Sequence, residues 1–394
     1  MVSLPLPYHN QMDLPQEIIN SIIFHLRYDR TTLRALSLVC STFLPESRRY
    51  LYQKIALARF DQRTYIPHEC FTLELNRNTE LFTTLSQRNP SIASYIHTFA
   101  YVFDPSHGDK EDICEWLNVC LQLMTNLKDL SFLFVRLPLA RLVQGCTFEL
   151  ETFRYGPWVT KWSSESTDLY DFITSQCTLR KLMFIEFNPH GGDFKKFLWP
   201  HTTFFPQLKH LIGTALIIEH ILPTCSPTSL SWVMFYGGDF YHVPNLGQKL
   251  EDMKSLCLHG GHIPVETRER MVAPLPSYCR HLQILHISGY LSEKFLSTNF
   301  SEVPHFPNLK IFIQSLPIPV SWQVWNKIRG DLATYLESRR LEVVAWFQEL
   351  HHLQVAYFQQ LPITEAKCFV AYERGVSEPI EVEAAEVWEI SPWI

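Results

Sequence analysis

The densest group of potential metal ligands in the chain is Cys257-x-His259-x-x-His262, with Cys279 further along. Thiolate and imidazole are the ligands that Zn²⁺ prefers, and four of them in a tetrahedron form a structural zinc site. The spacing here matches no standard paired-ligand motif, and Cys257 falls inside an apolar run that is typical of a strand. We therefore interpret Cys257 as a buried strand residue and His259 as part of the Gly260-Gly261 turn, and we predict no metal site.

No other group of residues has the spacing that catalysis needs. His351-His352, and His220 with Cys225, stand without further companions. The chain contains no phosphate-binding loop, no dinucleotide fingerprint and no Gly-x-Ser-x-Gly elbow. We expect no catalytic residue and no cofactor, and we interpret the chain as a binding protein and not an enzyme.

The composition indicates an ordered protein of two or three domains. The chain has 394 residues, of which 46% are hydrophobic and 19% charged. A net charge of −6 gives no general attraction to nucleic acid or to an anionic membrane. The N-terminus lacks a basic segment before an apolar run, so we expect no signal peptide. The ten scattered cysteines are then expected to be reduced thiols, in the cytoplasm, the nucleus or both.

Charge is distributed unevenly between the two ends of the chain. Residues 1–60 carry seven Lys or Arg against four Asp or Glu, a net of +3, whereas residues 361–394 carry seven Glu against two basic residues, a net of −5. The basic N-terminal segment favours an acidic partner.

Three short helices are predicted over residues 13–52. Asp13 can cap the first helix, and Pro15 is tolerated in its first turn because a proline there leaves no hydrogen bond unmade. Asp29 and the two threonines after it start a second helix, and Pro45 either ends that helix or opens a third over Glu46–Tyr52. Helices this short contain too little apolar surface to be stable alone, so we expect them to need a neighbour or a partner.

Residues 13–52 resemble the F-box family. The family begins Leu-Pro-x-Glu-apolar-apolar, and here the residues are Leu14-Pro15-Gln16-Glu17-Ile18-Ile19. It continues with Leu-x-x-apolar-Ser-x-Val-Cys, which matches Leu33-Arg34-Ala35-Leu36-Ser37-Leu38-Val39-Cys40. An aromatic residue follows at Phe43, where many members have Trp, and the next residues look like a large fungal subgroup.

The resemblance implies that these helices dock a Skp-type adaptor, which links the chain to a cullin-RING ubiquitin ligase. By this resemblance the expected contact residues are Leu14, Pro15, Ile18, Ile22, Leu36, Val39, Cys40 and Phe43. For Ile19, Ile23 and Leu33 two interpretations stay open, namely contact with the adaptor and packing within the helices.

From about residue 90 the chain repeats a unit of the form apolar-x-x-apolar-x-apolar. Successive units start 22 to 31 residues apart, except for a last interval of 44, and most intervals are in or near the range of leucine-rich repeats. The units are Ile96/Phe99/Tyr101, Leu127/Leu130/Phe132, Leu150/Phe153/Tyr155, Leu179/Leu182/Phe184, Leu208/Leu211/Gly213, Leu230/Val233/Phe235, Met253/Leu256/Leu258, Leu282/Leu285/Ile287, Leu309/Phe312 and Leu353/Ala356/Phe358. Helices are expected between some of them, over 113–121, 168–176 and 320–348. Strand, turn and helix at this period predict a curved solenoid with a parallel sheet.

Trp158 and Trp162 are candidate target-binding residues. They follow the strand predicted at Tyr155, in a segment that contains Gly156 and Pro157. Loops in this position rim a solenoid, where partners commonly bind, and Trp is a frequent anchor in interfaces. The alternative is that both are partly buried core residues.

These observations together predict an α/β or α+β chain with four parts. Residues 1–12 are an extension, 13–58 an F-box of three helices, 59–360 an irregular leucine-rich-repeat-like domain that binds a target, and 361–394 an acidic tail or cap. The expected function is target recognition for an SCF-type ubiquitin ligase, which leads to ubiquitin-dependent degradation. Two alternatives remain, namely a binding module that serves no ligase and an enzyme with an unrecognised site.

Overall fold

The computed structural model describes residues 14–39, 41–58, 70–74, 78–102, 110–135, 137, 139–157, 166–185, 205–234, 240–260, 270–289, 303–315, 322–360 and 368–390. Over these residues the chain is a mixed α/β protein with a mostly parallel sheet. It divides into two compact units. The first holds the described residues up to Ser131 and those of Leu137–Phe148, and the second holds those of Phe132–Arg136 and from Glu149 onward.

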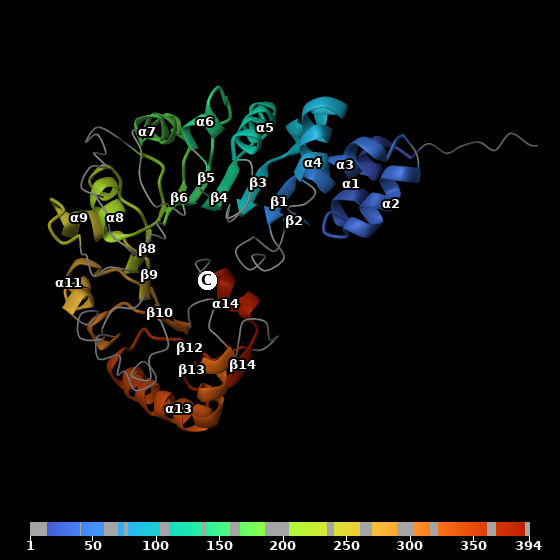
Figure 1. The fold of residues 1–394 in the computed structure, drawn as a ribbon. Coiled ribbons are helices and arrows are strands. Elements are labelled where there is room, and N and C mark those ends of the chain that lie inside the picture. The colour runs from blue at the N-terminus through green and yellow to red at the C-terminus, as the bar shows by residue number, and fades with distance from the viewer. Residues whose placement is uncertain are drawn as a thin grey trace, which may run out of the picture. The chain divides into compact units, whose positions relative to one another are not determined.

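The first unit begins with helices and continues into parallel strands (Figure 1). Its elements are α1 (Gln16–His25), α2 (Arg30–Val39), α3 (Leu44–Tyr52), β1 (Lys54–Ala58), β2 (Phe71–Glu74), α4 (Asn78–Thr83), η3 (Thr84–Arg88), η4 (Pro90–Tyr95), β3 (Thr98–Val102), α5 (Lys110–Leu123), the start of β4 (Asp129–Val135) and α6 (Leu139–Val143). Strand β1 lies between β2 and β3 and is parallel to both, with Ile55 opposite Phe71 on one side and Phe99 on the other.

The second unit alternates strands with helices or turns along most of its length. Its elements after β4 are β5 (Thr152–Pro157), α7 (Ser166–Ser175), β6 (Lys181–Phe184), β7 (His210–Gly213), α8 (Ala215–Ile221), η6 (Leu222–Thr224), β8 (Ser229–Met234), α9 (Leu246–Leu250), β9 (Ser255–Gly260), α11 (Leu275–Tyr278), β10 (Ile284–Gly289), η7 (Val303–His305), β11 (Ile311–Ser315), α13 (Trp322–Glu349), β12 (Val355–Gln359), β13 (Phe369–Glu373), β14 (Ile380–Val382) and α14 (Ala384–Ile390). The helices predicted over 113–121, 168–176 and 320–348 correspond to α5, α7 and α13 and are confirmed.

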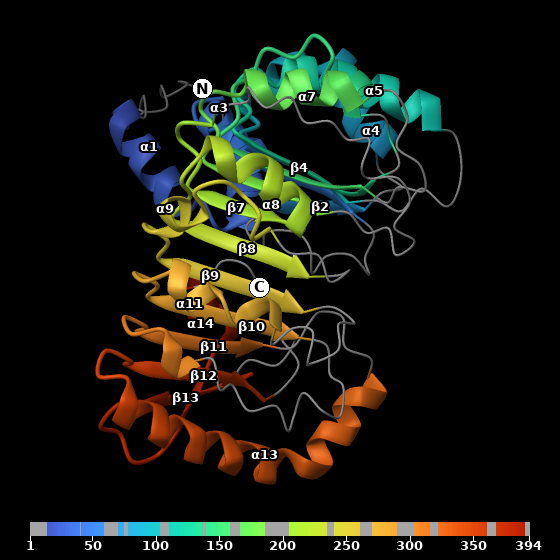
Figure 2. The same cartoon turned by 90° about the vertical axis from the view of Figure 1, so that its left-hand side faces the viewer.

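Strands β5 to β12 follow one another in the sheet in sequence order, and each pair is parallel. The order from β7 to β12 can be followed in Figure 2. Strands β13 and β14 then join antiparallel. Helix α14 packs its Ala384 and Val387 with Ile313 and Phe369, on one side of these last strands. Part of the segment that the sequence assigned to an acidic tail or cap, Ile380–Val382, is thus a strand of the sheet.

The repeated apolar residues determine where each strand starts. The second residue of each unit is buried on one face of the sheet, as Leu182, Leu211 and Leu256 are, because alternate residues of a strand point to the same side. The first residue closes a turn before the strand. The N–H of Leu208 donates to the carbonyl of Phe205, and the N–H of Leu309 donates to that of Phe306 in the same way.

One backbone contact recurs at every step between neighbouring strands of the second unit from β5 to β12. The carbonyl of the residue before one strand accepts two consecutive N–H groups at the start of the next. For example, the carbonyl of Lys209 accepts from Thr228 and Ser229, and that of Thr228 accepts from Lys254 and Ser255. The recurrence shows that the units repeat in backbone geometry as well as in sequence.

The predicted unit Leu230/Val233/Phe235 is wrong in register. Leu230 pairs with Leu211 on one side and Leu256 on the other, so it is the second residue of its unit, and the fully buried Trp232 is the third. The first position is then Pro227, which cannot donate the N–H that closes the turn. The segment Ser229–Met234 is buried on both faces, so the hydrophobic pattern fits two registers. Phe235 lies outside the described residues.

Gly213 stands where the other units carry a large side chain, and α8 explains the exception. A Cβ at Gly213 would lie 2.9 Å from the Cβ and the Cγ2 of Ile217. Ile217 is itself buried, so the isoleucine of the helix fills the space that a third apolar residue of the strand would take.

Candidate functional site

Helices α1, α2 and α3 hold a small apolar core of their own. Ile19, Ile23 and Leu33 are fully or almost fully buried in it. Leu26, Leu36, Phe43, Tyr50 and Leu51 pack against this core and are partly buried. For Ile19, Ile23 and Leu33 the structure therefore favours packing within the helices over contact with a partner.

Local hydrogen bonds determine where the first two helices begin. The carboxylate of Asp29 accepts from the backbone N–H of Thr32 at 3.0 Å and from the hydroxyl of Thr32 at 2.6 Å, which caps the start of α2. These bonds lower the pKa of Asp29, with the Thr32 hydroxyl as the largest cause. Pro15 precedes α1, and its carbonyl accepts from Ile18 and Ile19. Asp13, the cap predicted for the first helix, lies outside the described residues.

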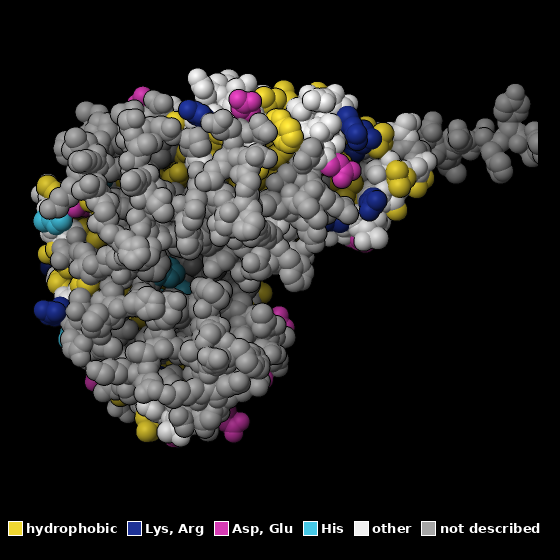
Figure 3. Space-filling view, in the orientation of Figure 1, with side chains coloured by type: hydrophobic (Ala, Val, Ile, Leu, Met, Phe, Trp, Pro, Cys, Tyr) yellow, Lys and Arg dark blue, Asp and Glu magenta, His cyan; other side chains and the backbone are white. Residues whose placement is uncertain are grey.

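Large apolar side chains remain exposed on α1 and α2, and hydrophobic and basic side chains gather at this part of the first unit in Figure 3. Within the described part of the chain, seven of the large hydrophobic residues that are exposed lie between Leu14 and Val39. They are Leu14, Ile18, Ile22, Phe24, Tyr28, Leu38 and Val39, which we call the α1–α2 apolar surface. Leu38 is 81% exposed and Tyr28 is 71% exposed, although helices of globular proteins usually bury one apolar face. Several exposed apolar side chains within one short segment indicate a candidate interaction site.

Basic side chains accompany this surface. The guanidinium of Arg27 lies over the rings of Phe24 and Tyr28, at 4.0 Å and 4.5 Å from their centroids, and donates to the carbonyl of Phe24. Residues 14–58 carry six Lys or Arg against three Asp or Glu. The surface can therefore attract an acidic partner and bury apolar area against it.

The predicted contact residues divide into three groups. Leu14, Pro15, Ile18, Ile22 and Val39 are exposed, and they lie on α1, on α2 or just before α1. Leu36 and Phe43 are only half-buried but pack against the core of the three helices, so their side chains are partly occupied there. Cys40 lies outside the described residues.

Three exposed residues were not among the expected contacts, namely Phe24, Tyr28 and Leu38. Phe24 and Tyr28 fall beside the apolar stripe of the first helix, and the stacking of Arg27 on both rings keeps them together. A search for Arg with an aromatic residue on each side, each within three positions of the Arg, would have identified this part of the surface.

A polar cluster lies elsewhere, on one face of the sheet in the second unit. The Sγ of Cys257 is 3.3 Å from the Nε2 of His259 and 3.3 Å from the Nδ1 of His286, and the Nε2 of His286 is 2.7 Å from the Oγ of Ser315. Cys257, His286 and Ser315 are buried and His259 is partly buried.

Burial keeps the members of this cluster neutral. It raises the pKa of the Cys257 thiol, lowers the pKa of His259 to about 4, and lowers the pKa of His286 well below its usual value. A thiol with a raised pKa is a poor nucleophile, because the thiolate is the reactive form.

Among its described residues, this cluster offers no ligand set for a metal. Within the described residues, no three or more His, Cys, Asp or Glu side chains are arranged to hold a metal ion. His262 lies outside them, and Cys279 is buried beside Leu275 at the end of α11. Trp158 and Trp162, the candidate target-binding residues, also lie outside the described part of the chain.

A search against models of known protein families and a search of curated proteins each returned no match. None of the helices in the described ranges has both the length and the apolar composition needed to cross a membrane.

Proposed function

We propose that the chain is an F-box protein that recognises targets for an SCF-type ubiquitin ligase. In this proposal α1–α3 dock a Skp-type adaptor, and the repeated strands that follow form an irregular leucine-rich-repeat domain that binds the target protein. The chain contributes no catalytic residue. It acts by holding the target close to the ubiquitin-conjugating enzyme that the ligase recruits, which raises the effective concentration of the two reactants.

The observation that carries the proposal is the α1–α2 apolar surface. Ile19, Ile23 and Leu33 already supply the core of the three helices, so the exposed residues are not needed to fold them. Burying about five Leu or Ile side chains gains roughly 1.5–3 kcal/mol each, which offsets the usual cost of association.

The repeated backbone geometry supports the second part of the proposal. Parallel strands in sequence order, a turn closed by the first apolar residue, and one carbonyl that accepts two N–H groups at each step are what stacked repeats require. Repeat domains of this class commonly present extended binding surfaces.

The test is co-purification with a Skp-type adaptor and a cullin. The chain is compared with the double variant Leu14→Ala, Pro15→Ala, and with Val119→Ala as a control, because Val119 is an exposed aliphatic residue on α5. The proposal predicts that the adaptor and the cullin co-purify with the parent and with the control, and that both are lost from the double variant. Adaptor without cullin would favour a binding module that serves no ligase, and a folded parent chain that retains neither would overturn the proposal.

A further inference from the structure

The residues that directly precede strands β6 to β11 form a continuous row along one edge of the sheet in the second unit. From the second of them onward, each donates its backbone N–H to the carbonyl of the one before, at 2.8–3.0 Å. These six residues, which we call the donor row, are Arg180, Lys209, Thr228, Lys254, Gln283 and Lys310. Neighbouring strands lie about 4.8 Å apart, so the donor row is roughly 24 Å long.

Every side chain of the donor row can donate hydrogen bonds, and four of the six are cationic. The four basic residues are exposed, and Thr228 and Gln283 between them are partly exposed. Hydrogen bonds between the strands hold the backbone of each residue at an equivalent place in its repeat, so the sheet sets the spacing of the donors along the edge. The donor row therefore places a cation at intervals of one or two strands.

Most of the positive charge of the donor row is not used within the described part of the chain. Lys209, Lys254 and Lys310 form no ion pair with another described residue. Arg180 lies 3.9 Å from the carboxylate of Glu151, and this pair is weak because both side chains are exposed to solvent.

The acidic residues on this edge do not cancel its charge. The turns before strands β6 to β11, taken with the residue that opens each strand, carry six Lys or Arg against Glu251 and Asp252, a net of +4. These segments are 177–181, 206–210, 226–229, 251–255, 280–284 and 307–311. With Glu151 included the net is still +3, whereas the whole chain has a net charge of −6. This edge therefore attracts an anionic partner.

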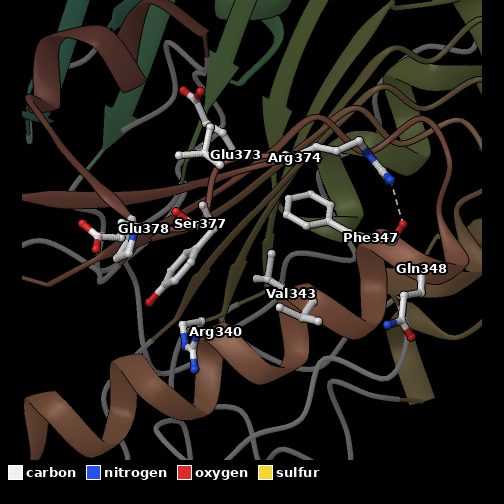
Figure 4. Close-up of a pocket in the computed structure, with 13 residues that line it drawn as sticks. Arg340, Val343, Phe347, Gln348, Glu373, Arg374, Ser377 and Glu378 are labelled. Atoms are coloured by element: carbon white, nitrogen blue, oxygen red, sulfur yellow. Dashed lines mark hydrogen bonds between the residues drawn. The ribbon is translucent and has the colours of Figure 1, made fainter.

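Arg374 is a contrasting cation at this edge, because its charge is used within the chain. Its backbone N–H donates to the carbonyl of Gln354, which follows Lys310 along the edge. Its guanidinium donates to three carbonyls at the C-terminal end of α13, and Figure 4 shows the bond to the carbonyl of Phe347. The positive charge that stays available to a partner therefore lies between Arg180 and Lys310.

We propose that the donor row binds an extended acidic segment of a partner protein. Its carboxylates accept charge-assisted hydrogen bonds from the basic side chains, and its other polar groups bond to Thr228 and Gln283. A basic segment is disfavoured because like charges would meet along the edge. A single-stranded nucleic acid is the less suitable polyanion, because the donor row has no aromatic side chain on which bases could stack.

Binding by the donor row needs the second unit alone, so it stands whether or not α1–α3 bind an adaptor. That the acidic segment belongs to the target of a ubiquitin ligase rests on the proposed function. The two are tested separately because the experiment below contains no adaptor.

The test uses the full chain and rhodamine-labelled peptides in which Glu and Ser alternate, followed by fluorescence anisotropy. An extended chain covers about 3.3 Å per residue, so a peptide of about eight residues matches the length of the donor row. Peptides of about half and twice that length are compared with it, as is a peptide with Lys in place of each Glu. The variant is Lys209→Gln with Lys310→Gln. Arg88→Gln with Arg141→Gln is the control, because it removes two exposed cations from the first unit.

We expect saturable binding of the Glu peptide and none of the Lys peptide, with an affinity that rises up to the matching length and changes little beyond it. The Lys209→Gln, Lys310→Gln variant should bind about tenfold more weakly at low salt, and the difference should shrink at high salt. The control should bind as the parent does. No binding of the Glu peptide, or an equal loss in the control, would overturn the proposal. So would a single-stranded oligonucleotide that binds more tightly than the Glu peptide and is lost in the same variant, because a nucleic acid would then be the occupant.

Discussion

Acidification should destabilise the second unit through His259 on β9 and His286 on β10. His286 is fully buried between Cys257 and Ser315, and His259 lies beside the same thiol. Burial therefore penalises the charged form of both rings and lowers the pKa of each.

The sign and the size of this change in the free energy of unfolding follow from the number of protons that the folded and the unfolded chain bind. With a folded pKa of about 4 for His259 and an unfolded value near 6.5, the unfolded chain binds more protons between these two values. The free energy of unfolding is then highest above about pH 6.5 and falls as the pH drops toward 4. Between pH 7 and pH 5 the loss from His259 alone is about 2 kcal/mol, and His286 adds to it in the same direction.

The assay is urea unfolding at pH 7 and pH 5, for the parent chain and for His259→Gln. Carboxylates also titrate in this range, so the informative quantity is the difference between the two proteins. We expect the pH-dependent loss to be smaller by about 2 kcal/mol in His259→Gln. His305→Gln, which changes an exposed histidine, is the control. The reasoning is refuted if His259→Gln and the parent lose the same free energy between the two pH values.

Three further predictions concern stability. Leu33→Ala should cost about 2–5 kcal/mol because Leu33 is fully buried, whereas Leu38→Ala should change the free energy of unfolding by less than about 0.5 kcal/mol, as chemical denaturation can measure. Arg374→Lys should raise hydrogen exchange in the last turn of α13, because Arg374 reaches three carbonyls with three separate nitrogens, whereas the donors of a lysine lie on one nitrogen. Unchanged exchange would contradict this. Gly213→Ala should lower the free energy of unfolding by about 1–3 kcal/mol through its clash with Ile217. If that clash is the cause, the double variant Gly213→Ala, Ile217→Ala should lose less free energy than the sum of the two single variants.

The spacing of apolar residues predicted most of the strands correctly because each strand buries alternate residues. Among the predicted units the exception was β8, where Pro227 replaces the expected first apolar residue and both faces of the strand are buried. Strands β1, β2 and β13 lie outside the predicted units. When an alternation of polar and apolar residues is absent, the pattern no longer distinguishes two registers. Pairing with β7 and β9, which are distant in sequence, decides the register instead.

The neighbours of Cys257 could not be found from local spacing. Local spacing pointed to His262 and Cys279, but the parallel pairing of β9 with β10 places His286 opposite Cys257. The two occupy equivalent positions in successive repeats, in Leu256-Cys257-Leu258 and Leu285-His286-Ile287. Superposing the repeats of the sequence by their buried residues would have brought them together.

On the N-terminal helices, sequence alone separated the core from the surface only in part. Ile18 and Ile19 are adjacent and chemically alike, yet Ile19 is buried in the core and Ile18 is 47% exposed. Both lie on the wide apolar stripe of one helix, and the packing of α2 and α3 decides which side of the stripe is covered.

The central claim is that the α1–α2 apolar surface docks a Skp-type adaptor. It is tested most directly by calorimetric titration of the purified chain with a purified adaptor, comparing the parent with Ile22→Asp and with Val119→Asp. The account predicts saturable one-to-one binding by the parent and by Val119→Asp, and at least about a hundredfold weaker binding by Ile22→Asp, because a buried unpaired carboxylate is costly. A folded parent chain that shows no binding, or an Ile22→Asp variant that binds as tightly as the parent, would contradict it.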